Sequence, residues 1–319
     1  MDEIEQQHRA ESESVSVIQL TMFTSDNPTV EEALRVFCEV YMPACQFAQT
    51  TRRGYRYDLT EWLAHSTVTK VKAISTASLK RYLSQLDAQG LQDSTRKRKV
   101  AAITTFLRFL EEQGVLPTNL SSSLVWPKVE RVDPRPLSPP QYAAILTEAA
   151  TNPRDFAMFA TLLQTGIRLS ELTGLTLENI TLPAKPSVDP ITGYGVLRLR
   201  RNGGRLTELV VNYKAARAIQ GYLAVRPHSP TQAIFLNRYG KALSNRSVEK
   251  AFKKYARAAG IPWAHVESLR TTHIIEHLAR KTDIQTVQEN AGHSSRKSTN
   301  HYAQVVKEAH IKAMQEHAL

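Results

Sequence analysis

Four side chains in the second half of the chain are of types that could attack a phosphodiester. Arg168 lies in TGIRLSEL and Arg270 in ESLRTTH, and they are followed by His293 in AGHSS and Tyr302 in HYAQV. A phenol can act as a nucleophile, an imidazole can donate or move a proton, and two guanidiniums can hold the oxygens of a phosphate. Because no metal-ligand spacing and no glycine-rich phosphate loop accompany them, we expect neither a metal nor another cofactor.

Taken singly, each of these residues has a simpler explanation. Arg168 could form a surface pair with Glu171, which lies three residues later and could hold the guanidinium in a fixed orientation. An arginine in the first turn of a helix, a histidine in a loop and a tyrosine in a helix are all common structural residues. The order and spacing of the whole set are far more specific than any member.

The four strings together resemble the tyrosine recombinase (phage integrase) family. In that family TGxRxSEL carries the first arginine, HxLRH carries the second, and LGHxS is followed nine residues later by a tyrosine. The segment from Leu269 to Tyr302 matches the pattern without a gap, and the resemblance covers nearly all of residues 27–319. It implies a site-specific DNA recombinase that needs neither metal nor ATP.

The resemblance also implies a role for each matched residue. Tyr302 would attack the scissile phosphate, form a 3′-phosphotyrosyl link and release a 5′-hydroxyl. Arg168 and Arg270 would hold the non-bridging oxygens, because a planar guanidinium fits them better than an ammonium group does. His293 would donate a hydrogen bond to the same phosphate or take part in proton transfer at Tyr302.

Two positions depart from the family pattern. Glu267 in AHVESLR stands where the family has a histidine, and it could orient Arg270 or act as a base. The family also has a lysine on a β-hairpin as the general acid, and that position falls near Asn202 in RLRRNGGRLTELVV, which contains no lysine. Arg205 could stabilise the leaving oxygen electrostatically, although an arginine is a poor acid at neutral pH.

The pattern of apolar residues, glycines and prolines predicts a mainly α fold with a small β-hairpin. We expect strands at 196–200 and 207–212, joined by a tight turn at Asn-Gly-Gly, with helices before and after them. Glycines at 90, 114, 166 and 292 are expected to end helices, and a short helix that begins near Ser295 and ends near Tyr302 is expected before a separate helical tail.

The predicted parts of the chain are a flexible acidic N-terminus at 1–26, a helical domain at 27–116, a proline-rich linker at 117–137 and a second domain with a helical tail at 138–319. The resemblance implies that residues 27–116 form a SAM-like core-binding domain and that residues 138–319 form the catalytic domain. The resemblance implies that the two domains form a clamp around DNA.

The overall charge suits a polyanionic partner. The formal net charge is +11 and 42% of the residues are hydrophobic, which is typical of a globular protein that binds nucleic acid. No apolar run reaches the length of a membrane span, and the acidic first twenty residues do not resemble a signal peptide, so we expect a cytoplasmic protein. Cys38 and Cys45 are expected to be reduced thiols.

Two basic clusters are predicted to contact DNA phosphates, and the C-terminal tail is predicted to contact another protomer. The clusters are Arg52, Arg53 and Arg56, and Arg96, Lys97, Arg98 and Lys99. The tail after Tyr302 is amphipathic, and the resemblance implies that it docks on a neighbour in a homotetramer on two DNA sites. Docking on its own domain is the alternative.

Other functions remain open at this level. A topoisomerase or a hairpin-forming resolvase would use the same residues. A catalytically weak DNA-binding accessory protein that retains the fold would account for Glu267 and the hairpin without lysine. The target sequence, and whether the outcome is integration, excision or resolution, are not encoded in these motifs.

Overall fold

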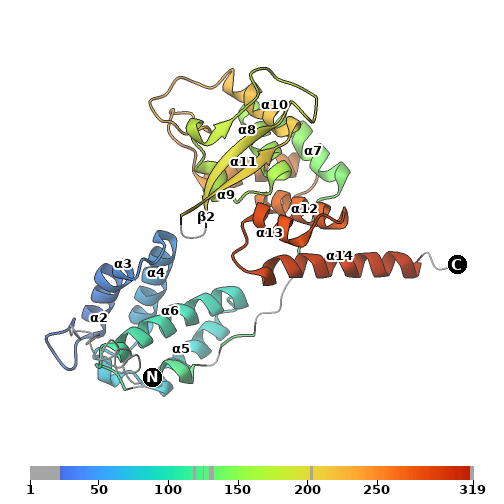
Figure 1. Cartoon of the computed structure of the whole chain (residues 1–319). Helices are drawn as coiled ribbons and strands as arrows, with labels where there is room; N and C mark the ends of the chain where they lie inside the picture. Colours follow the sequence, from blue (N-terminus) through green and yellow to red (C-terminus); the bar gives the residue numbers. More distant parts are fainter. Residues whose placement is uncertain (1–21, 118–119, 125, 129–132, 202–203, 317–319) are drawn as a thin grey trace, which may run out of the picture. The chain divides into compact units, whose positions relative to one another are not determined.

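The computed structural model (Figure 1) describes residues 22–117, 120–124, 126–128, 133–201 and 204–316. The chain divides into two compact units, residues 1–131 and 132–319. Most of the predicted acidic N-terminus and parts of the predicted linker lie outside the described residues. In the described part of the chain, no helix has the length and apolar character needed to cross a membrane. Cys38 and Cys45 are free thiols, as predicted.

The first unit is helical throughout its described part. Its elements are α2 (Val30–Val36), η1 (Phe37–Tyr41), α3 (Met42–Ala44), α4 (Gln49–His65), η2 (Val71–Ala73), α5 (Thr76–Ala88), α6 (Asp93–Glu112) and η3 (Ser121–Ser123). The Thr29 side chain caps α2 by accepting a hydrogen bond from the Glu32 backbone N–H at 3.1 Å. Gly90 and Gly114 have positive φ and follow the C-cap residues of α5 and α6, which confirms the predicted glycine ends.

The second unit carries all four residues of the proposed chemistry. Its elements are α7 (Pro139–Ala149), α8 (Pro153–Thr165), α9 (Leu169–Thr173), η4 (Leu177–Asn179), β1 (Ile180–Thr181), β2 (Gly195–Arg201), β3 (Arg205–Val211), α10 (Tyr213–Leu223), α11 (Asn245–Ala258), α12 (Val266–Ala279), α13 (Ile284–Ala291) and α14 (Arg296–Glu316). Helix α8 is buried along most of its length and packs against α10 and α12. A rigid central helix therefore supports the elements around the site.

The sheet is antiparallel in the order β1-β2-β3. Leu197 pairs with Leu209 and Arg201 pairs with Arg205, so the predicted hairpin is confirmed. Strand β1 was not predicted, because two residues are too short for a period-2 pattern. Asn202, which stands in the turn, lies outside the described residues.

The C-terminal helix differs from the expectation. The sequence predicted a short helix that ends near Tyr302 and a separate tail helix, whereas α14 is a single helix from Arg296 to Glu316 (Figure 1). Neither proline nor glycine occurs between these residues, so nothing in the sequence interrupts the backbone hydrogen bonds. Tyr302 therefore lies within a continuous helix.

Candidate active site

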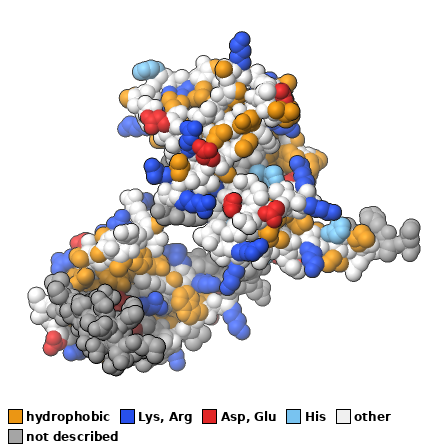
Figure 2. Space-filling view, viewed as in Figure 1, with side chains coloured by type: hydrophobic (Ala, Val, Ile, Leu, Met, Phe, Trp, Pro, Cys, Tyr) orange, Lys and Arg blue, Asp and Glu red, His pale blue; other side chains and the backbone are white. Residues whose placement is uncertain are grey.

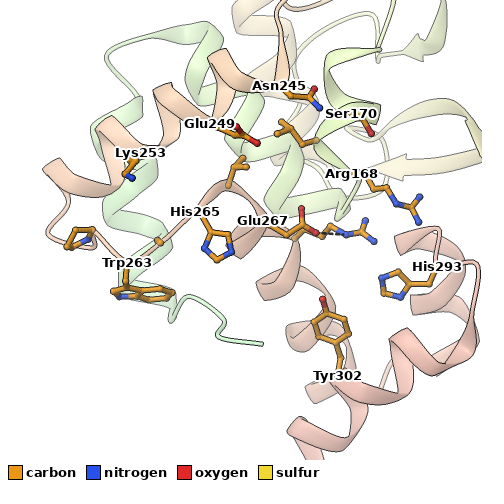
Figure 3. Close-up of a pocket in the computed structure, with 15 residues that line it drawn as sticks. Arg168, Ser170, Asn245, Glu249, Lys253, Trp263, His265, Glu267, His293 and Tyr302 are labelled. Atoms are coloured by element: carbon orange, nitrogen blue, oxygen red, sulfur yellow. Dashed lines mark ion pairs between the residues drawn. The ribbon is translucent and has the colours of Figure 1, made fainter. Parts of the chain in front are cut away.

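Arg168, Arg270, His293 and Tyr302 line one open groove of about 910 Å³ within the second unit (Figure 3). Each comes from a different element. Arg168 caps α9, Arg270 lies in α12, His293 follows α13 and Tyr302 lies in α14. The four residues are spread over 135 positions of the sequence, and the fold brings them to one groove of a single chain.

Arg168 is held by a sharp change of backbone direction and by a carboxylate. Helix α8 ends at Gly166, whose φ of 63° is in the left-handed region, and a Cβ there would collide with the His273 ring. Arg168 follows as the N-cap of α9. Glu171 accepts hydrogen bonds from the Arg168 backbone N–H at 2.8 Å and from its Nη1 at 3.1 Å. The predicted Arg168–Glu171 contact is therefore present.

Arg270 is almost completely buried, with 4% of its surface exposed. Its Nη1 donates to the Gly166 carbonyl, its Nη2 donates to the Ala291 carbonyl at 2.7 Å, and its Nε lies 3.2 Å from Glu267 Oε1. Burial lowers the pKa of Arg270, but a guanidinium still keeps its proton. Arg270 therefore presents a fixed positive charge at the groove.

His293 is placed by a second glycine turn. Gly292 ends α13 with a φ of 63°, and His293 Nδ1 then lies 2.9 Å from the hydroxyl of Thr299. Burial, together with the nearby Arg270 and Arg168 charges, lowers the pKa of His293 to about 4. The imidazole is therefore neutral at neutral pH, with one nitrogen as donor and the other as acceptor.

Tyr302 has both a packing role and an exposed reactive end. Its ring packs against a small apolar cluster of Ile274, Val287 and Ala291. The ring also lies parallel to that of His293, with centroids 6.0 Å apart and an interplanar angle of 12°. Figure 3 shows the hydroxyl directed into the groove. The fold thus fixes the ring and leaves the phenol oxygen accessible.

Glu267 lines the same groove one helical turn before Arg270. Its side chain is half exposed and forms the ion pair with Arg270 that is dashed in Figure 3. Burial raises the pKa of Glu267, and the charges of Arg270, His265 and Arg168 oppose that rise. Glu267 therefore lies beside Arg270 at the groove, and its raised pKa makes it easier to protonate than an ordinary carboxylate.

The hairpin residues are placed differently from the rest of the predicted site. Arg205 is exposed and lines a separate cavity of about 390 Å³, together with Ser294 and Arg296. His293 lines both this cavity and the groove. The structure therefore does not bring Arg205 into the groove with Tyr302, and Asn202 lies outside the described residues.

Several residues near the groove were not singled out from the sequence. Thr299 contacts His293, and Asn245 and Lys253 of α11 line the groove. No sequence signal marks them, since Asn245 and Lys253 are polar residues on an exposed helix surface and Thr299 is a buried polar residue within a helix. Arg201 was noted only as part of the basic hairpin, but alternation along β2 places it on the same buried face as Leu197 and Leu199.

The two predicted DNA-binding clusters lie close together in the first unit, because α4 packs against α6. A Cβ on Gly54 would lie 3.9 Å from Arg98 Nη1. Arg53, Arg56, Lys97 and Arg98 are exposed, and Lys and Arg side chains occur on the surface of both units in Figure 2. Arg52 and Arg96 are half-buried, and Arg96 forms ion pairs with two aspartates.

Lys99 does not fit the prediction of a surface contact. It is 3% exposed, and its Nζ lies 2.8 Å from Glu61 and 3.4 Å from Asp58. A run of basic residues on a helix places about one member in four on the buried face, and burial of a lysine requires a paired carboxylate. Lys99 lies four and seven residues before the buried Ile103 and Phe106, so the helical period places it on the buried face of α6.

Comparisons with known proteins agree with the geometry. The model of the phage integrase family matches residues 135–309, and the model of the phage integrase N-terminal SAM-like domain matches residues 34–114. The chain therefore belongs to the phage integrase family. In the described residues, no group of His, Cys, Asp and Glu side chains could hold a metal ion.

The similar proteins include several named tyrosine recombinase XerC. One from Pelobacter propionicus is 33% identical over 71% of this chain and 74% of its own length, and one from Roseiflexus sp. (strain RS-1) is 29% identical over 81% and 84%. Among solved structures, a lambda integrase tetramer bound to a Holliday junction has a TM-score of 0.69 at 15% identity, covering 86% of this chain and 77% of that one. XerH in a post-cleavage complex with its palindromic difH substrate has a TM-score of 0.65 at 17% identity, covering 88% and 82%. These structures share the fold.

Proposed function

We propose that this protein is a site-specific DNA recombinase that cleaves and rejoins strands through a covalent 3′-phosphotyrosyl link at Tyr302. The observation that carries the proposal is the groove, where Tyr302 meets two arginines and a neutral histidine. Each group has a task in phosphodiester exchange. A DNA-binding accessory protein would not require a phenol, an imidazole and two guanidiniums around one groove.

In the proposed reaction, the Tyr302 oxygen attacks the phosphorus and the 5′-oxygen of the next nucleotide leaves. Arg168 and Arg270 hold the non-bridging oxygens, and their charge stabilises the transition state more than the ground state. His293 donates a hydrogen bond to the phosphate or receives the phenol proton. Attack of the 5′-hydroxyl on the phosphotyrosine reverses the step and rejoins DNA, because the ester energy is kept in the protein link.

The leaving oxygen needs stabilisation that a hairpin lysine would otherwise supply. We propose that Arg205 and Asn202 provide it electrostatically when DNA occupies the groove. Because a guanidinium does not give up its proton at neutral pH, the proton itself would come from another donor.

A suicide substrate with a nick near the cleavage position tests the proposal. The short fragment diffuses away after cleavage, so the covalent protein–DNA adduct accumulates. We expect the adduct to form without metal or ATP, with the protein joined to the 3′ end of the strand upstream of the break, so that a label at the 5′ end of that strand stays with the protein. Relaxation of plasmid that lacks a specific site would instead favour a topoisomerase, and no adduct on any cognate DNA would reject cleavage altogether.

Glu267 is proposed to orient Arg270 and to gain a proton when phosphate binds. A bound phosphate would bring a further negative charge near Glu267 and would raise its pKa, as the charge of Glu171 does. The charges of Arg270, His265 and Arg168 lower the pKa of Glu267. His293, Tyr302, Glu249 and Lys253 also line this groove. Once protonated, Glu267 can donate a hydrogen bond to the phosphate, as the family histidine would.

We therefore expect Glu267→Gln to alter the pH dependence of cleavage. Because the pKa of Glu267 is raised, its protonated and more active form is favoured as the pH falls. Wild-type cleavage at saturating DNA should therefore rise as the pH falls. In Glu267→Gln, which keeps a donor at all pH values, that rise should disappear.

The matched control for this change is Glu249→Gln, which removes an exposed carboxylate from the same groove. The control should keep the wild-type pH profile. An unchanged profile in Glu267→Gln would contradict the proposed protonation. Single-turnover adduct formation measured from pH 5.5 to 8.5 provides the comparison.

The exposed cations on α4 and α6 are proposed to contact DNA phosphates without reading sequence. Replacing Arg53 and Lys97 together with alanine should weaken binding to specific and non-specific DNA alike. The slope of log affinity against log salt should decrease by about two, one for each lost phosphate contact. Lys72→Ala, an exposed cation outside α4 and α6, is the control. An unchanged salt slope in the double variant would reject this surface.

We further propose that the two domains, with the limits predicted from the sequence, enclose double-stranded DNA as a clamp. We also propose that four copies of the protein act together on two DNA sites. The end of α14 exposes Ile311 and Met314, at 45% and 65%, which suits docking on a neighbouring protomer. A cytoplasmic protein of a mobile element would fit this activity. Sedimentation of the DNA complex tests the assembly, because only one or two protomers on paired sites would contradict a tetramer.

A further inference from the structure

Arg201 is a buried arginine at the end of a strand whose other arginines are exposed. Alternate residues of β2 face opposite sides, so Arg198 and Arg200 point outward while Arg201 points inward. Its side chain is only 2% exposed. A buried cation is unfavourable unless its charge and its N–H groups are satisfied, so the partners of Arg201 are informative.

One set of partners is the carboxylate of Glu171. Arg201 Nε donates to Glu171 Oε1 at 2.8 Å, and Arg201 Nη2 donates to Oε2 at 2.8 Å. This two-point geometry fixes the plane and the direction of the carboxylate, as a single hydrogen bond cannot. Burial opposes ionisation of Glu171, but the hydrogen bonds from Arg201 and Arg168 hold its pKa below the ordinary value. Glu171 is therefore an ionised link between the two arginines.

The other partners are at the end of α13. Arg201 Nη1 donates to the carbonyls of Glu289 and Asn290, both at 2.9 Å. The last carbonyls of a helix have no partner within it, and the negative end of the helix dipole attracts a cation. Arg270 binds the next carbonyl, and Arg168 binds that of Gly292. Three guanidiniums thus hold the turn that carries His293.

We propose that Arg201 is a positioning residue, which aligns Arg168 through Glu171 and aligns His293 through the end of α13. This inference rests on the proposed recombinase function. Arg201 uses both edges of its guanidinium for these contacts, so it does not itself need to touch the phosphate. It also ties β2, beside the hairpin turn, to the catalytic groove.

The requirement is geometric, so a lysine should not replace Arg201. An ammonium group keeps the charge but cannot span a carboxylate and two carbonyls in one plane. In Arg201→Ala, Glu171 loses two hydrogen bonds and the end of α13 loses a cap. A displacement of about 1 Å at catalytic groups can reduce a rate by about 10²-fold.

The experiment compares Arg201→Ala and Arg201→Lys with Arg198→Ala. Arg198 is the matched control, because it pairs with Glu208 at 3.1 Å on the exposed face of the same sheet. At saturating DNA, we expect single-turnover adduct formation to fall by about 10²-fold in Arg201→Ala and about tenfold in Arg201→Lys. DNA affinity should stay within about twofold, and Arg198→Ala should cleave like the wild type.

A second readout tests whether the Arg201 charge acts on His293 in the folded protein, which a loss of stability alone would not change. We expect an NMR titration of the His293 imidazole to give a pKa of about 4, because burial and the charges of Arg270, Arg168 and Arg201 lower it. In Arg201→Ala the pKa of His293 should rise, whereas Arg201→Lys should leave it nearly unchanged. If Arg201→Ala does not fold, Arg201→Lys and Glu171→Gln provide the test, with thermal melting as the check on folding.

The outcomes are distinct. A folded Arg201→Ala that cleaves at the wild-type rate, or that loses only DNA affinity, would overturn the proposal. A wild-type protein that forms no adduct would reject the recombinase function instead, and the His293 titration would still report whether the Arg201 charge acts on that ring.

Discussion

Tyr302→Phe is expected to abolish the covalent adduct while leaving the fold and DNA binding intact. The substitution removes only the phenol oxygen. The ring would still pack against Ile274, Val287 and Ala291, and it would still lie parallel to His293. Since no other group in the proposed mechanism supplies the nucleophile, adduct formation should fall by a factor on the order of 10⁴ or more.

The measurement is adduct formation on a nicked suicide substrate, with a gel-shift assay for binding. Tyr239→Phe is the control, because Tyr239 belongs to the same unit and is 70% exposed away from the groove residues. Adduct in Tyr302→Phe at a rate near that of the wild type would mean that another residue attacks the phosphate. Unchanged biological activity without any adduct would favour the DNA-binding accessory protein.

Gly292→Ala should have the second largest effect, although it adds a single methyl group. The Cβ would lie 2.9 Å from Arg168 Nη1 and 2.9 Å from Arg201 Cζ. Both guanidiniums are fixed by carboxylate and carbonyl partners, so neither can move without losing hydrogen bonds. We expect cleavage at saturating DNA to fall by about 10²-fold or more.

Gly260→Ala separates this contact from backbone strain. Gly260 has a φ of 74°, similar to the 63° of Gly292, but no atom lies within 4 Å of its added Cβ. Both variants should lose about 1–2 kcal/mol of unfolding free energy from the left-handed backbone. Only Gly292→Ala should lose cleavage as well. Equal cleavage by the two variants would show that the arginines tolerate the methyl group, and chemical denaturation gives the stability comparison.

Much of the fold followed from local patterns in the sequence. Apolar periodicity and the glycines at positions 90, 114, 166 and 292 predicted helices and helix ends that the structure contains. The Asn-Gly-Gly turn predicted the β2–β3 hairpin. These features depend on neighbouring residues in the chain, which is why sequence reasoning could find them. Strand β1 is two residues long and has no local pattern of its own.

The active-site residues could be named from their types and spacing, but their surroundings could not. The motifs identified Arg168, Arg270, His293 and Tyr302, and three residues of separation predicted the contact with Glu171. The two helices expected around Tyr302 are one continuous helix, because the segment contains no proline or glycine that would end the first of them. Lys99 turned inward because Asp58 and Glu61, about forty residues earlier, lie opposite it.

The sequence by itself therefore determined which groups this protein brings to phosphodiester chemistry, since reactivity belongs to the side-chain type. Only the tertiary structure decided how those groups are held. The guanidiniums of Arg168, Arg201 and Arg270 converge on the carbonyls at the end of α13. Arg168 and Arg201 come from segments that lie more than 80 residues before those carbonyls in the chain. A buried cation is stable only where distant carbonyls and carboxylates meet it. That meeting depends on packing between elements, which no local pattern encodes.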